Sequence, residues 1–247
     1  MRKPAAITHL AKPINMKNSL PILALSTLAM AASAGSLSVS VVDKDGKPVP
    51  DAVIVVLPVN KSAQPKTPLP LQAGISQEKM QFIPAVTLVP VGAKVRFVNN
   101  DPWDHHVRSS PAGMGQFNTT NAGFELRLEG KPDGKPARTS DVTMDKPGVM
   151  GATLLGCFIH GSMRGYVYVS DSPWAVKTGA NGIATFDDLP DGKAQIKLWQ
   201  ADQLIDVPLQ STTIGAAAAK STFQLTVVPR RVRAPVTTPQ STYPQGG

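Results

Sequence analysis

The sequence predicts an all-β protein, and two observations support this prediction. Short runs that alternate apolar and polar residues recur along the chain, separated by Pro, Gly and Asp-Gly turn signals, which is typical of antiparallel sandwiches. The only long helical pattern lies at the N-terminus, before residue 35. The chain has 247 residues and 42% hydrophobic composition, enough to fill the core of one large or two small domains.

The first 34 residues have the pattern of a secretory signal peptide. Basic residues precede an apolar run from Leu20, and the small residues Ala32, Ser33 and Ala34 follow it. The run is about 15 residues long, shorter than the roughly 20 needed to cross the hydrocarbon layer. We therefore expect cleavage before Gly35, export to the periplasm or beyond, and no stable membrane span. An organellar transit peptide is the alternative, but the compact apolar centre argues against it.

The net charge of +8 says little about partners, because it comes mostly from the two ends. The signal holds four of the 25 basic residues and no acidic one, which leaves 21 basic against 17 acidic residues. Arg230, Arg231 and Arg233 account for three more, so residues 35–228 carry 18 against 17, or +1. Residues 35–228 are therefore nearly neutral and have no basic stripe of the kind that binds nucleic acid.

The elements after the signal follow in order. Residues 36–60 read as two alternating strands around the turn at Asp45 and Gly46, with Pro48 and Pro50 ending the ladder. Residues 61–75 are expected to be a linker, because residues 61–72 are rich in Pro and Lys.

Several short strands are expected in residues 76–171, including one from Val95 to Asn99 and one in the segment YVYVSD. Residues 173–228 form another run of strands without ligand candidates. The tail, residues 229–247, is polar and Pro-rich, and we expect it to be disordered.

Cys157 is the only cysteine, so it cannot form an internal disulfide. It could be a buried apolar thiol or an intermolecular link. However, His160 follows three positions later and Met163 three further on, and a thiolate, two imidazoles and a weak thioether form the ligand set of blue-copper sites. The second imidazole comes from His105 or His106. Neighbouring strand residues face opposite sides, so only one of them can reach the metal.

Two segments of the chain resemble the cupredoxin (blue copper) family, nearest to amicyanin and the plastocyanin-like proteins of methylamine utilisation. The matching residues are Cys157, His160, Met163, Arg164, Gly165 and Val167, together with Asn100, Asp101, His105 and Val107. The resemblance covers about residues 76–171 and implies a Greek-key β-sandwich. Two features depart from it: a polar insertion, GKPDGKPARTS, lengthens the stretch between His105 and Cys157, and position 106 is His where the family usually carries Asn.

The resemblance implies one copper ion, cycling between Cu(I) and Cu(II), held by His105, Cys157, His160 and Met163. The family places the ligand His directly before one residue and a valine, as in His105, His106 and Val107, so it favours His105 and leaves His106 as a surface imidazole. Met163 would be the weak axial ligand, and His160 would lie near the surface as the electron exit. Asn100 either ties the two ligand loops together or forms a turn. Asp101 and Asp104 are expected to cap this turn with their side chains, rather than to act as a pair of catalytic carboxylates. Trp103 and Phe158 are expected to shield the site.

Residues 173–228 resemble a different family, the transthyretin-like or carboxypeptidase regulatory-like sandwich. The matching residues are Thr178, Gly182, Phe186, Leu189, Pro190 and Gly192. In that family, a segment like residues 36–60 runs directly on into this part. We therefore predict that residues 36–60 and 173–228 form one small discontinuous β-sandwich, with the copper domain inserted in its loop. Alternatively, a strand of residues 36–60 pairs with the copper domain that it precedes.

Together these features predict a non-enzymatic carrier of single electrons between redox partners such as a c-type cytochrome or a periplasmic dehydrogenase. A copper oxidase or nitrite reductase typically needs a His directly before the ligand Cys, where this chain has Gly156, and four histidines cannot build a multicopper cluster. The remaining alternative is a copper-binding or partner-binding module with a structural or storage copper site.

Overall fold

The computed structural model describes residues 34–61, 63–113, 123–147 and 151–230, and this part of the chain is all-β. The predicted all-β class is thereby confirmed. The predicted signal peptide, apart from Ala34, and the tail beyond Arg230 lie outside the described residues. Within the described ranges, no helix is both long enough and apolar enough to cross a membrane.

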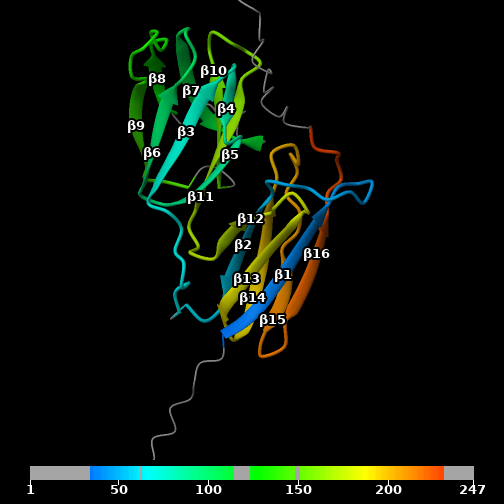
Figure 1. Ribbon diagram of the computed structural model, residues 1–247. Helices are drawn as coiled ribbons and strands as arrows, with labels where there is room; N and C mark the ends of the chain where they lie inside the picture. The colour runs from blue at the N-terminus through cyan, green and yellow to red at the C-terminus, as the bar shows by residue number, and fades with distance from the viewer. Residues whose placement is uncertain (1–33, 62, 114–122, 148–150, 231–247) are drawn as a thin grey trace, which may run out of the picture. The chain divides into compact units, whose positions relative to one another are not determined.

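Strands β3 to β11 form two sheets, with the orders β4-β3-β6-β9 and β5-β11-β10-β7-β8 (Figure 1). Their bounds are β3 Gln72–Glu78, β4 Gln81–Ile83, β5 Val86–Pro90, β6 Ala93–Asn99, β7 His105–Pro111, β8 Glu125–Leu128, β9 Arg138–Met144, β10 Ala152–Cys157 and β11 Arg164–Ser170. An apolar core that includes Phe97, Leu155 and Val167 is buried within these strands.

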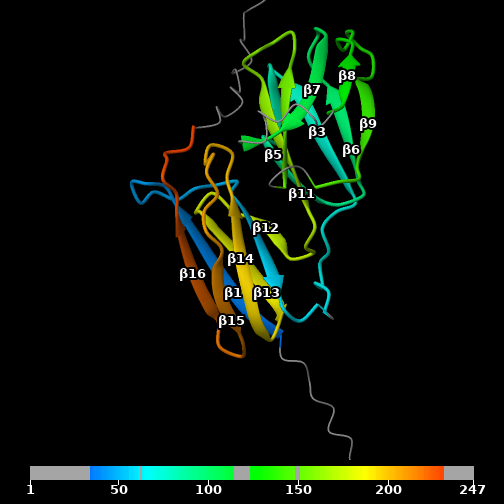
Figure 2. The same cartoon turned by 180° about the vertical axis from the view of Figure 1, so that it is seen from behind.

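The remaining strands form two further sheets, with the orders β13-β1-β16 and β12-β2-β14-β15. Their bounds are β1 Ala34–Val42, β2 Val53–Pro58, β12 Ala175–Lys177, β13 Ile183–Pro190, β14 Gly192–Trp199, β15 Gln210–Ile214 and β16 Ala219–Gln224. Figure 1 shows β1, the first strand of the described residues, beside β13 and β16. Figure 2 shows β14 next to β15 from behind. A second apolar core, with Leu37, Ile54 and Phe223, is buried here.

The strand directions differ from the purely antiparallel sandwich that the sequence predicted. Three pairs are parallel: β1 with β16, β3 with β6, and β5 with β11. In each of these pairs the partner strands are separated along the chain by other elements. Alternation of apolar and polar residues defines which face of a strand is buried, but it does not define the direction of the neighbouring strand.

β1 and β2 were predicted to flank one turn, and they do, but they lie in different sheets. The chain turns through Gly46, whose φ of 78° is in the left-handed region, and then enters β2. β2 is buried on both faces: Ile54 and Val56 belong to the second core, whereas Val53 and Val55 join another apolar cluster with Tyr168 and Trp199. The continuous run Val53–Val56 therefore replaces the expected alternation.

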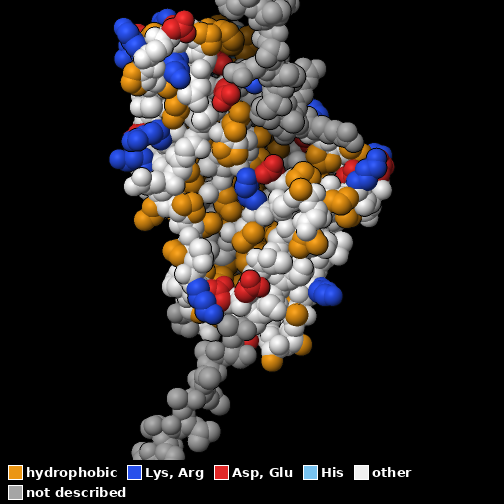
Figure 3. Space-filling view, viewed as in Figure 1, with side chains coloured by type: hydrophobic (Ala, Val, Ile, Leu, Met, Phe, Trp, Pro, Cys, Tyr) orange, Lys and Arg blue, Asp and Glu red, His pale blue; other side chains and the backbone are white. Residues whose placement is uncertain are grey.

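One predicted boundary moves. β3 begins at Gln72, inside the stretch expected to be linker, and pairs with β6 from Gln72 to Gln77. The Pro-rich composition ends at Pro70, and residues after it can donate to a ladder. On the face seen in Figure 3, Lys and Arg side chains are scattered, several of them next to acidic ones, as expected for a nearly neutral folded part.

Candidate metal centre

The ends of two paired strands bring the predicted nitrogen and sulfur donors together. His105 is the first residue of β7 and Cys157 is the last residue of β10. Cys157 lies opposite Val107 in the antiparallel pair. Because residues two apart in a strand share a face, His105 lies on the same face as Val107 and Cys157. His160 follows in the turn after β10, and the three side chains form one group whose donor atoms lie within 4.8 Å of one another.

His106 occupies the opposite face of β7. Its side chain is partly exposed, its Nε2 lies 3.5 Å from Glu125 Oε2, and its ring contacts the ring of Phe158 with centroids 5.9 Å apart. The geometry therefore brings His105 to Cys157 and directs His106 away. Alternation required that only one of the two face the site, and the resemblance favoured His105.

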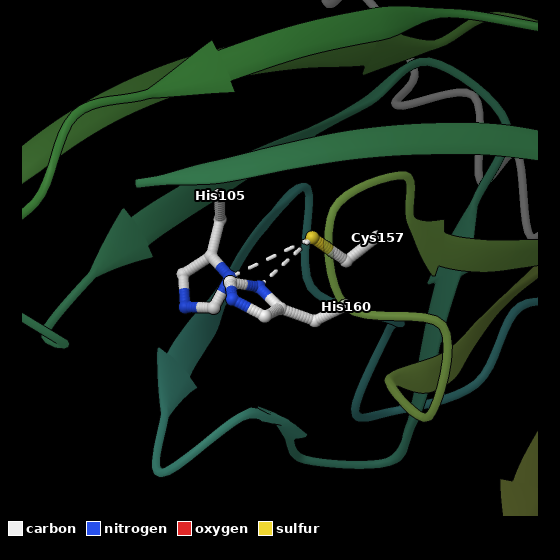
Figure 4. Close-up of side chains that lie close together, drawn as sticks. All are labelled: His105, Cys157 and His160. Carbon is white, nitrogen blue, oxygen red and sulfur yellow. Dashed lines mark hydrogen bonds between the residues drawn. The ribbon is translucent and has the colours of Figure 1, made fainter. Parts of the chain in front are cut away.

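The donor atoms are spaced as one metal ion requires (Figure 4). Cys157 Sγ lies 3.7 Å from His105 Nδ1 and 3.5 Å from His160 Nδ1, and the two Nδ1 atoms are 3.2 Å apart. Transition-metal bonds of roughly 2.0 Å to nitrogen and 2.3 Å to sulfur would hold such atoms roughly 3.3–3.8 Å apart in trigonal or tetrahedral geometry. The three measured distances agree with this range to about 0.1 Å, so the residues fit a metal.

A buried carboxylate determines which nitrogen of His105 is free. Asp101 Oδ2 lies 2.9 Å from His105 Nε2, and the two side chains are 5% and 0% exposed. An ionised carboxylate only accepts hydrogen bonds, so Nε2 carries the proton and donates it to Asp101. In the neutral form of the ring, the lone pair then lies on Nδ1, the atom that faces Cys157 and His160.

Backbone groups of the turn between β3 and β4 hold the Asp101 carboxylate. Lys79 N donates to Oδ1 at 2.6 Å and Met80 N donates to Oδ2 at 3.1 Å. Both turn residues have left-handed backbones, with φ of 52° and 60°, and this conformation directs two successive N–H groups to one side. The turn before β7 is thereby connected to a second turn that lies about twenty residues earlier in the chain.

Asn99, a fully buried residue at the end of β6, organises the turn that leads to His105. Its Oδ1 accepts from Asp101 N at 3.0 Å, and its Nδ2 donates to the carbonyls of Trp103 and Glu129 at 2.9 Å and of Leu128 at 3.1 Å. The sequence argument considered Asn100 for this role, but the hydrogen bond of Asn100 found here is from its backbone N–H to Gln77 O. The burial alternation of β6 points Asn99 inward.

Sequence reasoning missed the role of Asp101, which it treated as a turn former. An Asp before Pro in a turn is common, and only its position four residues before the candidate ligand His105 could have indicated more. Asp104 is a partly exposed turn residue, as expected for a turn former. The Arg127 guanidinium, 2.7 Å away, and the N–H of Gly130 lower the pKa of its carboxyl.

Met163 is buried at 2% exposure in the same core cluster as Cys157, and its N–H donates to His160 O at 3.0 Å. This closes the loop that carries His160. Trp103 and Phe158 do not form the expected apolar shield. They are 40% and 72% exposed, and because the Cys157 side chain points inward, the next residue points outward.

The fold and the group of residues together define the class: an all-β protein with a His-Cys-His group, able to bind a transition metal, at the end of a sheet. No family model matches the chain, and no curated protein matches it. Among solved structures, it is similar to the amicyanin of Paracoccus versutus (Thiobacillus versutus), at 17% identity over 47% of this chain and 97% of that one, with a TM-score of 0.31. A reduced Cu(I) mutant amicyanin at pH 4 matches at 20% identity over 45% and 100% of the two chains, also with a TM-score of 0.31. These likenesses are distant, and membership in the cupredoxin family stays a proposal.

Proposed function

We propose that this chain is an exported blue-copper protein that carries single electrons, with copper bound by His105, Cys157, His160 and Met163. One observation carries the proposal: a cysteine sulfur and two imidazole Nδ1 atoms meet at the spacing of a single ion. Bound copper would supply one-electron chemistry, and this donor set with a weak axial thioether is the blue-copper set.

The chain's own residues suit that role. Asp101 keeps the Nδ1 lone pair of His105 directed at the centre. Cys157 and His105 are buried, so water has little access to that side. Binding a metal would remove the thiol proton of Cys157. His160 is only partly buried, and it is the residue through which we expect electrons to leave. Met163, from the same short loop, would be the axial ligand.

We also propose that the copper-binding part, β3 to β11, is inserted in a discontinuous transthyretin-like sandwich. Strand pairing supports this: β1 pairs with β13 and β16, and β2 pairs with β12 and β14. In the described residues, neither β1 nor β2 pairs with any of the strands β3 to β11, as the alternative would require. Export to the periplasm and a cytochrome or dehydrogenase as redox partner complete the proposal.

Absorption spectroscopy of residues 35–247 loaded with Cu(II) tests the site directly. We expect an intense blue colour from charge transfer between thiolate and copper. Cys157→Ala and His105→Ala should abolish it, whereas the matched neighbour variant His106→Ala should keep it. A pale spectrum of wild type with only weak d–d bands would refute the blue-copper assignment.

Voltammetry then separates a carrier from a copper store. A carrier should give a reversible one-electron wave and fast self-exchange between oxidised and reduced protein. A blue protein with slow exchange would favour the alternative, a copper-binding or partner-binding module.

A further inference from the structure

The side chain of Asp101 is built into the metal centre more firmly than its place in a turn requires. It is 3% exposed, and its two oxygens accept three N–H groups: Lys79 N, Met80 N and His105 Nε2. Its own N–H is held by Asn99 and its carbonyl accepts from Lys131 N at 2.7 Å. Every polar part of this residue therefore has a partner, and the carboxylate cannot turn away from His105 without breaking several bonds.

We propose that Asp101 is a positioning residue that sets the tautomer and ring orientation of His105 and makes the centre favour Cu(II) over Cu(I). This inference rests on the proposed function. A hydrogen bond from the far nitrogen of a ligand His to a carboxylate orients the ring and raises the basicity of the ligand nitrogen. A more basic nitrogen donor stabilises the more highly charged ion more strongly.

Burial increases the effect of the Asp101 charge. A charge interacts more strongly where the surroundings are less polarisable than water and where salt does not screen it. Asp104, in the same turn, makes a useful contrast: it is partly exposed, pairs with Arg127 and accepts a hydrogen bond from Gly130 N. The two carboxylates are three positions apart, but of the two only Asp101 bonds to a candidate ligand.

The test compares Asp101→Asn with the matched control Asp104→Asn, both in residues 35–247. In metal-free protein, nitrogen NMR of the rings should show His105 protonated at Nε2 in wild type and in the control, and a mixture of tautomers in Asp101→Asn. Titrations with Cu(II) and with Cu(I) should show a loss of about 10–100-fold in Cu(II) affinity for Asp101→Asn, with a smaller loss for Cu(I), and hence a higher reduction potential. The control should change either affinity by less than about threefold.

Asp101→Glu, which keeps the charge on a longer side chain, should recover part of the Cu(II) preference. If Asp101→Asn does not fold, Asp101→Ser is the second neutral variant. Unchanged tautomer and affinities in the neutral variant would overturn the inference. Equal losses for Cu(II) and Cu(I) would overturn its claim on the preference between oxidation states. If wild type binds no copper, the proposed function fails, but the tautomer of His105 in metal-free protein still tests whether Asp101 positions the ring.

Discussion

Replacing Thr178 with Val tests whether the two distant segments of the discontinuous sandwich depend on each other. Thr178 is buried, and its Oγ1 accepts from Ala52 N at 2.9 Å and donates to Val49 O at 2.7 Å. These partners precede it by 126 and 129 residues. Val has nearly the same shape but no hydroxyl, so both backbone groups would lose this partner inside the protein.

The expected loss follows from these two groups. A buried polar group left without a partner costs about 1–3 kcal/mol, so the two together cost about 2–6 kcal/mol. The methyl that replaces the hydroxyl returns about 0.8 kcal/mol. We therefore expect the free energy of unfolding to fall by about 1–5 kcal/mol, with the backbone bonds between Thr178 and residues 51 and 52 keeping the strands in register.

Urea unfolding of metal-free residues 35–247, followed by circular dichroism, measures this change. Thr178→Ser is the matched control, because it keeps the hydroxyl and removes only the methyl. If the Val variant is at least as stable as the Ser variant, then Thr178 does not bridge to residues 49–52, and the discontinuous sandwich loses its best-defined contact.

Three further predictions follow from the structure. In urea unfolding, Gly151→Ala should destabilise the fold strongly, because a Cβ at Gly151 would lie 2.5 Å from the Tyr168 ring and the backbone φ is 88°. Gly74→Ala is the matched control and should have a mild effect, because a Cβ there would meet no atom within 4 Å. Equal effects of the two substitutions would contradict this packing. Gln77→Leu should raise the free energy of unfolding by about 1–3 kcal/mol, because both polar side-chain atoms of Gln77 are buried without a hydrogen-bond partner in the described residues. A lower free energy of unfolding in urea would contradict this and would mean that the side chain has a partner. In thermal unfolding, Zn(II) at 100 times its dissociation constant should stabilise the wild-type protein by about 2.7 kcal/mol. The Cys157→Ala variant should lose most of this stabilisation. Equal stabilisation of both proteins would mean that the metal binds at another site.

The candidate site was predictable where its signal is local. His160 follows Cys157 by three residues, in the turn directly after β10, so their proximity follows from chain connectivity, and copper chemistry makes the pair informative. Alternation along the strand, which is also a local property, showed that only one of His105 and His106 could face the metal. The choice of His105 came from the cupredoxin-like pattern, in which the ligand His is followed by one residue and then Val107. Asp101 and Asn99 could not be recognised in this way. Their roles depend on the left-handed turn at Lys79 and Met80 and on carbonyls of residues 128 and 129, which the chain brings close only when it folds.

The sequence alone determined that the chain forms strands, because alternation and turn residues act over a few positions at a time. Where residues alternate along a strand, it also indicated that one face is apolar and the other polar. Only the tertiary structure decided that β1 lies between β13 and β16, that three strand pairs are parallel, and that β2 is covered on both faces. The physical reason is that hydrogen bonds between strands and burial against a second layer join residues far apart in the chain, and alternation along one strand carries no information about which partner it meets.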